Sequence, residues 1–295
     1  MKLLTYRRDG AVRHGCLTAG SPDALVTELG DGDLLGLIEE HGDFAGWRPA
    51  SGGRTYRLSE LEPLAPLQRP GKLLGVAANY QEHVTELGAA RLDKAGLAPR
   101  LFLMPITALA GPGAEIPFPS VSEQIDWEAE LAVVLGRTAK DVAVEDALGV
   151  VAGYAVGNDV SARSVDYGYP RDTGDPAVGF FDWLAGKWLD GFAPIGPYLV
   201  TAGEVTDPQS LDIELRVNGR IRQQGSTKEM IFTVAELISF ASRLMTLRPG
   251  DVLLTGTPSG VGAASGEFLA PGDVMEVSIA GLGTLTNSVS RRRTP

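Results

Sequence analysis

The sequence predicts a β-rich α+β fold in which a small N-terminal unit precedes a larger domain. Short apolar runs are separated by glycine and proline, of which the 295-residue chain has 37 and 19, and such punctuation is typical of many short strands. Only residues 233–251, TVAELISFASRLMTLRPGD, have a convincing helical period. The proline-rich segment at 62–72 indicates a linker, because proline disfavours helices and central strands. We therefore predict a small α+β domain over 1–68 and a larger domain over 69–295.

Three short strands and one helix are expected in the N-terminal unit. The strands are LLTYRR at 3–8, HGCLTAG at 14–20 and ALVTELG at 24–30, which are broken by glycine, aspartate and a Ser-Pro pair. The segment GDLLGLIEEHGDF at 32–44 is compatible with a single helix. Cys16 is the only cysteine, so no intramolecular disulfide can form, and we expect it to pack as a small residue.

The larger domain is expected to begin with the strand LLGVAANY at 73–80. Further along, residues 211–217 alternate between apolar and polar, and the following Asn218-Gly219 predicts a hairpin turn. The one clear helix has Thr233 as its expected N-cap, with Glu236 completing a capping box. Other short apolar runs, expected to be strands, lie at 101–105, 131–136, 150–160, 195–200, 251–258 and 273–283.

Composition excludes several classes of protein. The formal net charge of −11 argues against a nucleic-acid partner, because phosphate binding requires a basic surface. The N-terminus lacks the long apolar core of a signal peptide. Every apolar stretch is far shorter than the roughly 20 residues needed to span a membrane. We therefore expect a soluble cytoplasmic protein that does not bind membranes.

Three carboxylates alternate in the segment DWEAELAVVLG at 126–136. Asp126, Glu128 and Glu130 would face the same side of a strand, about 6.6 Å apart from one to the next. Carboxylates packed together repel one another unless a cation lies between them, and oxygen ligands favour Mg²⁺, Mn²⁺ or Ca²⁺. Asp159 ends another apolar strand and is a good third ligand if the two strands are neighbours. The alternative is a solvated face of an edge strand.

Residues 79–86, NYQEHVTE, form a second candidate site. Asn79 could cap a short helix, with Glu82 completing a capping box. On that helix His83 and Glu86 are three residues apart and share a face. A carboxylate beside an imidazole fixes its tautomer and raises its basicity, as a general base requires. A surface His–Glu pair is the alternative.

The glycine-rich segment LLTGTPSGVG at 253–262 is a third candidate. It is not a phosphate-binding P-loop, because Gly256 and Gly260 have the wrong spacing and no Lys-Ser/Thr follows. Backbone N–H groups near Gly256 and the hydroxyl of Thr257 could instead stabilise an oxyanion. A tight turn between two strands is the alternative.

Taken in order, these stretches resemble the fumarylacetoacetate hydrolase family. The resemblance extends from about Leu73 to Val289, while the first 68 residues have no comparable signature. It is carried by seven segments: VAANYQEHVTE, FLMPITALAGPGAEIPFP, DWEAELAVVLGR, VAGYAVGNDVSAR, GKWLDGFAPIGPYLV, VNGRIRQQGSTKEMIFTVAELISFAS and LRPGDVLLTGTPSGVG.

The resemblance implies a catalytic domain of mixed β-sheet rolled into a β-sandwich, usually as a homodimer. It implies that three carboxylates bind Mg²⁺ (Mn²⁺ or Ca²⁺ being alternatives), that a His–Glu dyad is catalytic, and that four further residues contact the substrate or lie near it. The expected metal ligands are Glu128, Glu130 and Asp159; the catalytic residues are His83, Glu86 and Lys187; the substrate-binding residues are Arg163, Asp166, Gly256 and Thr257.

The implied chemistry acts on 2-keto acids or 1,3-dicarbonyls. Hydrolysis of a C–C bond is the leading interpretation, with His83 oriented by Glu86 to deprotonate water. A decarboxylase or a keto–enol isomerase of the same substrates would use the same groups. A non-catalytic binding protein on the same fold is the remaining alternative.

The chain departs from the family pattern at three places. Met104 stands where a lysine is common, which removes a cation near the expected pocket. Ser164 and Asp166 replace the residues usual after NDVSAR, and the gain of Asp166, together with the loss of a cation at Met104, disfavours a doubly anionic substrate. Residues 164–183 form a longer, aromatic-rich segment, which either enlarges an apolar pocket or contributes to a dimer interface.

Overall fold

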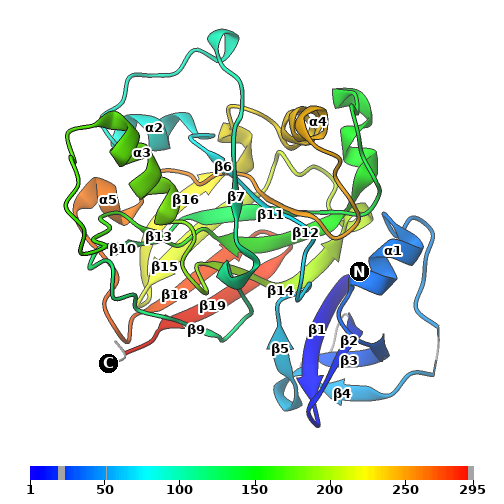
Figure 1. The fold of residues 1–295 in the computed structure, drawn as a ribbon. Coiled ribbons are helices and arrows are strands. Elements are labelled where there is room, and N and C mark those ends of the chain that lie inside the picture. Colours follow the sequence, from blue (N-terminus) through cyan, green and yellow to red (C-terminus); the bar gives the residue numbers. More distant parts are fainter. Residues whose placement is uncertain (19–23, 51, 292–295) are drawn as a thin grey trace.

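The computed structural model describes residues 1–18, 24–50 and 52–291, and over these ranges the chain is β-rich, as predicted (Figure 1). Its strands form a large mixed sheet, a second sheet and a small two-stranded one. The large sheet contains β1 (Lys2–Arg8), β2 (Ala11–Thr18), β3 (Leu25–Asp31), β4 (Thr55–Arg57), β5 (Glu62–Leu64), β6 (Leu73–Ala77), β7 (Arg100–Met104), β8 (Leu109–Ala110), β11 (Ala129–Leu135), β12 (Val151–Asn158), β14 (Ala193–Thr201) and β17 (Val252–Leu254). The second contains β9 (Glu115–Ile116), β15 (Asp212–Val217), β16 (Arg220–Ser226), β18 (Val274–Ile279) and β19 (Gly283–Val289), and the third β10 (Ile125–Asp126) and β13 (Ser161–Ala162).

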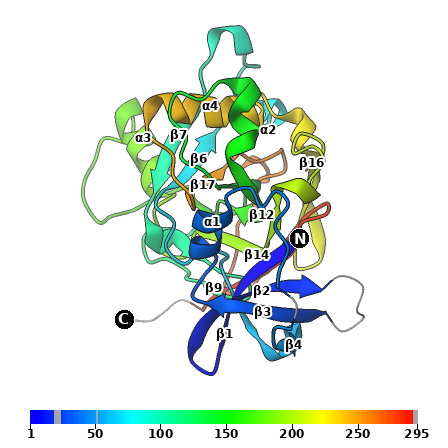
Figure 2. The same ribbon diagram turned by 90° about the vertical axis from the view of Figure 1, so that its right-hand side faces the viewer.

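Helices are short and cover the ends of the sheets. Figures 1 and 2 show α2, α3 and α4 at one end of the molecule and β1–β4 at the other. The α-helices are α1 (Leu35–His41), α2 (Gln81–Glu86), α3 (Pro176–Ala185), α4 (Val234–Leu244) and α5 (Gly262–Ser265). The 3-10 turns are η1 (Leu58–Glu60), η2 (Lys94–Gly96), η3 (Ile106–Ala108), η4 (Val144–Val150), η5 (Ala202–Glu204) and η6 (Thr227–Glu229). No helix in the described part of the chain is long and apolar enough to span a membrane.

The central strands β11 and β12 are buried along their whole length. Successive side chains of β11 enter different cores, since residues of a strand alternate between faces. Leu131 and Val133 pack in one core with side chains of the second sheet and of α4, such as Leu215. Ala132 and Val134 pack in the other core, beside α1. The result is the predicted β-sandwich, and the polar cluster described below lies where β11 begins and β12 ends.

The N-terminal strands join the large sheet directly. β1 pairs with β14, so the sheet order β4-β3-β2-β1-β14-β12-β11-β17-β6-β7 is continuous from one part of the chain to the other. The prediction of a linker at 62–72 is wrong for its first residues, because β5 pairs with β1 and places Pro63 opposite Tyr6. Of the strand expected at 14–20, the last two residues lie outside the described ranges. The domain division at residue 68 stays a prediction.

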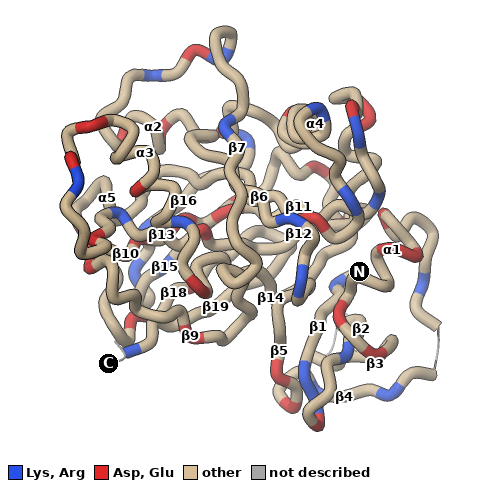
Figure 3. The backbone as a smooth tube through the Cα atoms, in the orientation of Figure 1, with Lys and Arg blue, Asp and Glu red and all other residues tan. Residues whose placement is uncertain are grey.

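Two local predictions are confirmed. Asn218 and Gly219 have φ values of 51° and 76° and close the β15–β16 hairpin, where Val217 pairs with Arg220. Thr233 is the N-cap of α4, and its side chain forms a reciprocal capping box with Glu236. Acidic and basic residues are spread over both parts of the chain (Figure 3).

Candidate active site

The sheet brings three carboxylates together. Glu130 lies on β11, Glu128 just before it, and Asp159 directly after β12. These two strands are antiparallel neighbours in which Ala129 pairs with Asn158, so the start of one lies beside the end of the other. Carboxylate oxygens of all three residues lie within 4.8 Å of one another, and all three residues are buried. Asp159 is predicted as a third ligand on condition that the two strands are neighbours, and they are.

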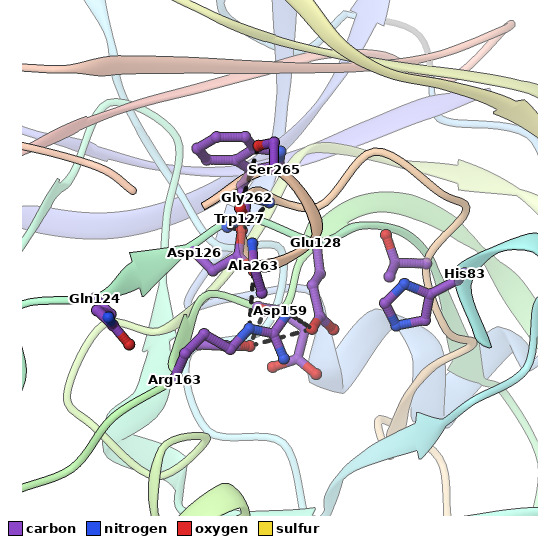
Figure 4. Close-up of polar contacts among 12 residues, drawn as sticks. His83, Gln124, Asp126, Trp127, Glu128, Asp159, Arg163, Gly262, Ala263 and Ser265 are labelled. Carbon is purple, nitrogen blue, oxygen red and sulfur yellow. Dashed lines mark hydrogen bonds and ion pairs between the residues drawn. The ribbon is translucent and has the colours of Figure 1, made fainter. Parts of the chain in front are cut away.

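Asp126 belongs to a different set of contacts. The strand expected over 126–136 is interrupted, because β10 ends at Asp126 and β11 starts at Ala129. The Asp126 carboxylate accepts hydrogen bonds from the backbone N–H groups of Gly262 (2.6 Å) and Ala263 (3.0 Å) at the start of α5. It also accepts one from Nε of Arg163 at 2.8 Å, as Figure 4 shows. Arg163 then links it to the cluster through a 2.5 Å contact with Glu128.

Lys187 and Arg163 supply positive charge to one side of the cluster. Nζ of Lys187 lies 2.8 Å from Glu128 and 2.7 Å from Asp159. Burial acts to raise the pKa of Glu128, but the two cations outweigh it and lower the pKa to about 2. Burial likewise acts to lower the pKa of Lys187, and attraction by Asp159 and Glu128 raises it instead. Glu128 and Lys187 are therefore a charged pair.

On the other side of the cluster, positive charge is insufficient to keep the pKa values of Glu130 and Asp159 low. Glu130 accepts a hydrogen bond from the Gly256 N–H at 2.7 Å, yet burial, then Asp159 and Glu128, raise its pKa well above the ordinary value. Burial is also the main reason why the pKa of Asp159 is raised to about 6. Oδ1 of Asp159 is buried and has no hydrogen-bond partner. Oxygen donors, surplus negative charge and an unpartnered oxygen fit a hard divalent cation.

The His–Glu pair forms on α2. Nδ1 of His83 lies 2.8 Å from a carboxylate oxygen of Glu86, and the other oxygen of Glu86 accepts a hydrogen bond from the Gly260 N–H at 2.7 Å. A carboxylate only accepts, so Nδ1 carries a proton, and the neutral form of this imidazole has its lone pair on Nε2. His83 is on the far side of Glu128 from Arg163 (Figure 4).

The predicted N-cap of α2 is wrong. The N-cap residue is Tyr80, and no side chain caps this helix. The Asn79 side chain donates instead to the carbonyls of Thr255 (2.8 Å) and Phe232 (3.1 Å), and it accepts from the Phe232 N–H. Asn79 is 1% exposed, so these distant partners replace the local N–H group that a cap would bind. Its role is to fix the segment that leads into α2.

One cavity of about 730 Å³ contains most of the predicted site. Six predicted residues line it: His83, Glu128, Asp159, Arg163, Lys187 and Thr257. The rest of its lining is mainly apolar or aromatic: Val76, Ala77, Ala78, Leu87, Arg100, Leu101, Phe102, Leu103, Phe180, Trp183, Leu184 and Trp188. A larger hollow of about 960 Å³ near Met1 contains none of the predicted site residues. The smaller cavity is therefore the candidate active site.

Three residues expected near the substrate, Met104, Asp166 and Gly256, do not line the cavity, and neither does the predicted metal ligand Glu130. Met104 is buried in the core and does not line the cavity, so its departure from the family pattern removes no charge from the lining. Asp166 is exposed and borders a separate hollow of about 230 Å³. Glu130 and Gly256 lie behind the lining, where the Gly256 N–H binds the Glu130 carboxylate and is not free for an oxyanion. Their roles toward a substrate stay predictions.

Sequence reasoning missed Gln223, which is 1% exposed on β16. Its amide accepts from the Ala129 N–H and donates to Oγ1 of Thr257, both at 2.8 Å. It thereby connects the start of β11 to the glycine-rich segment. The sequence holds a weak signal, since Gln223 pairs with the inward-facing Leu215 of the alternating strand, where a polar residue is unexpected.

A β-sandwich that holds a buried carboxylate cluster beside a His–Glu pair, in a largely apolar cavity, defines a metal-dependent enzyme that acts on small molecules. The model for the fumarylacetoacetate (FAA) hydrolase C-terminal domain matches residues 72–290. The chain belongs to the fumarylacetoacetate hydrolase family.

Relatives in this family include both hydrolases and isomerases. The chain is 42% identical over 241 residues, 80% of each protein, to 2,4-didehydro-3-deoxy-L-rhamnonate hydrolase of Sphingomonas sp. (strain SKA58). It resembles the structure of 5-carboxymethyl-2-hydroxymuconate delta-isomerase from Mycobacterium smegmatis at TM-score 0.77 and 34% identity, covering 99% of this chain and 100% of the other. It also resembles maleylpyruvate hydrolase from Sphingobium sp. SYK-6 in complex with manganese(II) and pyruvate, at TM-score 0.79, 28% identity and the same coverage.

Proposed function

We propose that this protein is a divalent-metal-dependent hydrolase that cleaves a C–C bond in a 2,4-diketo acid. The observation that carries the proposal is the meeting of a basic His83–Glu86 pair and a buried three-carboxylate cluster at one cavity. The hydrolases named among its relatives support this reaction, and the manganese complex supports a metal.

Glu128, Glu130 and Asp159 would hold the cation, with Mg²⁺ or Mn²⁺ as the expected metal. When bound, it would supply Lewis acidity to the keto and carboxylate oxygens of the substrate. Lys187 contacts Glu128 and Asp159 in the cavity wall and can donate a hydrogen bond to the same substrate oxygens. Arg163 holds Glu128 in place from the Asp126 side.

His83 is the proposed general base. Its Nε2 takes a proton from water, while Glu86 stabilises the imidazolium that forms. The hydroxide adds to the distal carbonyl at C4, the C3–C4 bond breaks, and its electron pair goes to C3, which is protonated. The products are a carboxylic acid and a 2-keto acid such as pyruvate. Because Gly260 fixes the second oxygen of Glu86, the dyad is joined to the glycine-rich segment.

Thr257 is the proposed oxyanion donor. Its Oγ1 accepts a hydrogen bond from Gln223, which leaves the hydroxyl proton free to be donated into the cavity. The hydroxyl therefore replaces the Gly256 N–H, which is bound to Glu130. A donor placed where charge develops is commonly worth 10² to 10³ in rate.

The test is turnover of simple acylpyruvates by the purified protein with Mg²⁺, Mn²⁺ or EDTA, with products identified by mass. Equal release of pyruvate and the matching carboxylic acid, lost in EDTA, is expected. Release of CO₂ would indicate a decarboxylase. An isomer of unchanged mass would indicate the second candidate, a keto–enol isomerase, which the similarity to the delta-isomerase supports.

We also propose a homodimer, as the family resemblance implies. Light scattering after size-exclusion chromatography should give twice the chain mass of 31.1 kDa. A monomeric mass with full activity would contradict this assembly.

A further inference from the structure

We infer that the substrate of this site carries an apolar group of about the size of a benzene ring on its distal acyl carbon, in place of a second carboxylate. The inference rests on the proposed function, because it assigns the metal-side end of the cavity to the keto acid. It concerns the other end, whose lining is formed by β7 and α3.

The cations that line the cavity are nearly all committed to its carboxylate end. Among the described lining residues they are Arg100, Arg163 and Lys187. Lys187 contacts Glu128 and Asp159, and Arg163 contacts Asp126 and Glu128. Arg100 is exposed at the start of β7. Outside the carboxylate end, the one cation among the described lining residues is therefore Arg100, at an exposed position. A second substrate carboxylate placed against the apolar lining would have no buried cation to pair with, which is costly.

An aromatic wall, formed by Phe102, Trp183 and Phe180, begins next to Lys187. The ring centroids of Phe102 and Trp183 lie 5.8 and 5.9 Å from its Nζ. The same two rings meet edge to face at 5.2 Å, and Phe180 lies 6.0 Å beyond Trp183. The wall thus runs from the carboxylate cluster toward the mouth, where Phe180 is 56% exposed. Aromatic rings in this arrangement would favour contact with a ring of the substrate.

A glycine, a helix cap and an ion pair hold this aromatic wall in place. Gly75 on β6 makes room for Phe102, since a Cβ there would lie 2.2 Å from the ring. Asp175 is the N-cap of helix α3, and its side chain accepts a hydrogen bond from the Ala177 N–H. A 3.0 Å ion pair joins Asp182 of the helix to Arg171 in the preceding segment.

Helix α3 turns one apolar face to the cavity. Phe180, Trp183 and Leu184 follow the i, i+3, i+4 spacing of one helix face, and all three line the cavity. Phe181 has a different direction, is 62% exposed and does not line it. Trp183 and Leu184 pack only partly against the core, and no residue of α3 is fully buried, so part of this apolar face is left available to a ligand.

The test compares three 2,4-diketo acids that differ only in the distal group. They are 2,4-dioxopentanoate with a methyl group, 2,4-dioxo-4-phenylbutanoate with a phenyl ring, and 2,4-dioxohexanedioate with a carboxylate. Each gives pyruvate, so one coupled assay measures all of them. We expect kcat/KM for the phenyl compound to exceed those of the other two at least tenfold, within the range that apolar pockets achieve. Equal or better turnover of the carboxylate compound would overturn the inference while leaving the proposed hydrolase intact.

Two variants on α3 locate the effect. Trp183→Ala should lower the phenyl-to-methyl ratio of kcat/KM about tenfold, and Phe180→Ala about threefold, because Phe180 lies nearer the mouth. Phe181→Ala is the matched control on the same helix and should leave the ratio unchanged. An unchanged ratio in both cavity variants, or an equal change in the control, would contradict the inferred wall.

A binding measurement separates the inference from the reaction. Calorimetric titration of the Mn²⁺-loaded protein with phenylpyruvate and with pyruvate measures how much the aromatic wall contributes to binding, without any bond cleavage. At least tenfold tighter binding of phenylpyruvate, lost in Trp183→Ala, is expected. If none of the diketo acids is cleaved and this difference persists, the hydrolase proposal is wrong and the apolar selectivity stands. Equal affinities would overturn the selectivity.

Discussion

The two ends of the cavity are built differently. At the carboxylate end, Glu128, Glu130 and Lys187 are at most 5% exposed; the two glutamates lie on or directly before β11, and Lys187, which follows α3, is held there by its contacts with Glu128 and Asp159. At the aromatic end, Phe180 and Leu103 are more than half exposed, on a peripheral helix and the last strand of the sheet. We conclude that the core of the sheet fixes the groups of the proposed reaction. Substitutions of the exposed residues at the aromatic end can therefore change substrate selectivity without moving those groups.

The largest effect is expected from Glu130→Gln at the buried end. The amide keeps the shape and the hydrogen bond from Gly256 but removes one charge from the proposed metal site. Activity should fall at least about 10³-fold, since the metal's contribution amounts to several kcal/mol. Bound Mn²⁺ is measured by electron paramagnetic resonance. The metal-free variant should unfold at no lower temperature than the wild type, because one repelling carboxylate is gone; clear destabilisation would point to a structural role instead.

His83→Ala should separate chemistry from metal binding within the same cavity. His83 contacts Glu86 and is no member of the carboxylate cluster, so Mn²⁺ affinity should stay within about threefold of the wild type. Loss of the proposed base should lower kcat by about 10² to 10⁴. Turnover at the wild-type rate would remove His83 from the mechanism.

Arg163→Lys is expected to have an intermediate effect. The guanidinium bridges Asp126 and Glu128 with two different nitrogens, which a lysine ammonium cannot reproduce with the same geometry. Residues that orient metal ligands typically change metal affinity or activity 10- to 100-fold. We expect a loss of that size in Mn²⁺ affinity, with the phenyl-to-methyl selectivity unchanged. A changed selectivity with normal metal affinity would place Arg163 against the substrate's distal group.

The buried end could largely be predicted from the sequence, and the aromatic end could not. Alternation along one strand and a carboxylate at the end of another bring Glu128, Glu130 and Asp159 together if the two strands are neighbours, and β11 and β12 are neighbours. Asp126 could not be separated from them, since the break after it depends on N–H groups of Gly262 and Ala263, more than 130 residues away.

Contacts between segments distant in the sequence also explain the other differences between the predictions and the structure. Asn79 has the sequence of a cap, but Thr255 and Phe232 offer it buried partners from distant segments. β5 exists because it pairs with β1 across more than 50 residues, which no local pattern reveals. Helix α3 has apolar residues outside the face of Phe180, Trp183 and Leu184, such as the exposed Phe181, so its sequence does not separate an apolar face from a polar one.

The smallest expected effect is on stability at the aromatic end. Phe180→Ala should change the free energy of unfolding by no more than about 0.5 kcal/mol, because its side chain is more than half exposed. Phe192→Ala is the matched control: this ring is fully buried in the core, and its loss should cost about 3 to 5 kcal/mol. Urea denaturation measures both. A large loss in Phe180→Ala would mean that α3 supports the fold, and the aromatic end would then not be free to vary independently of the buried one.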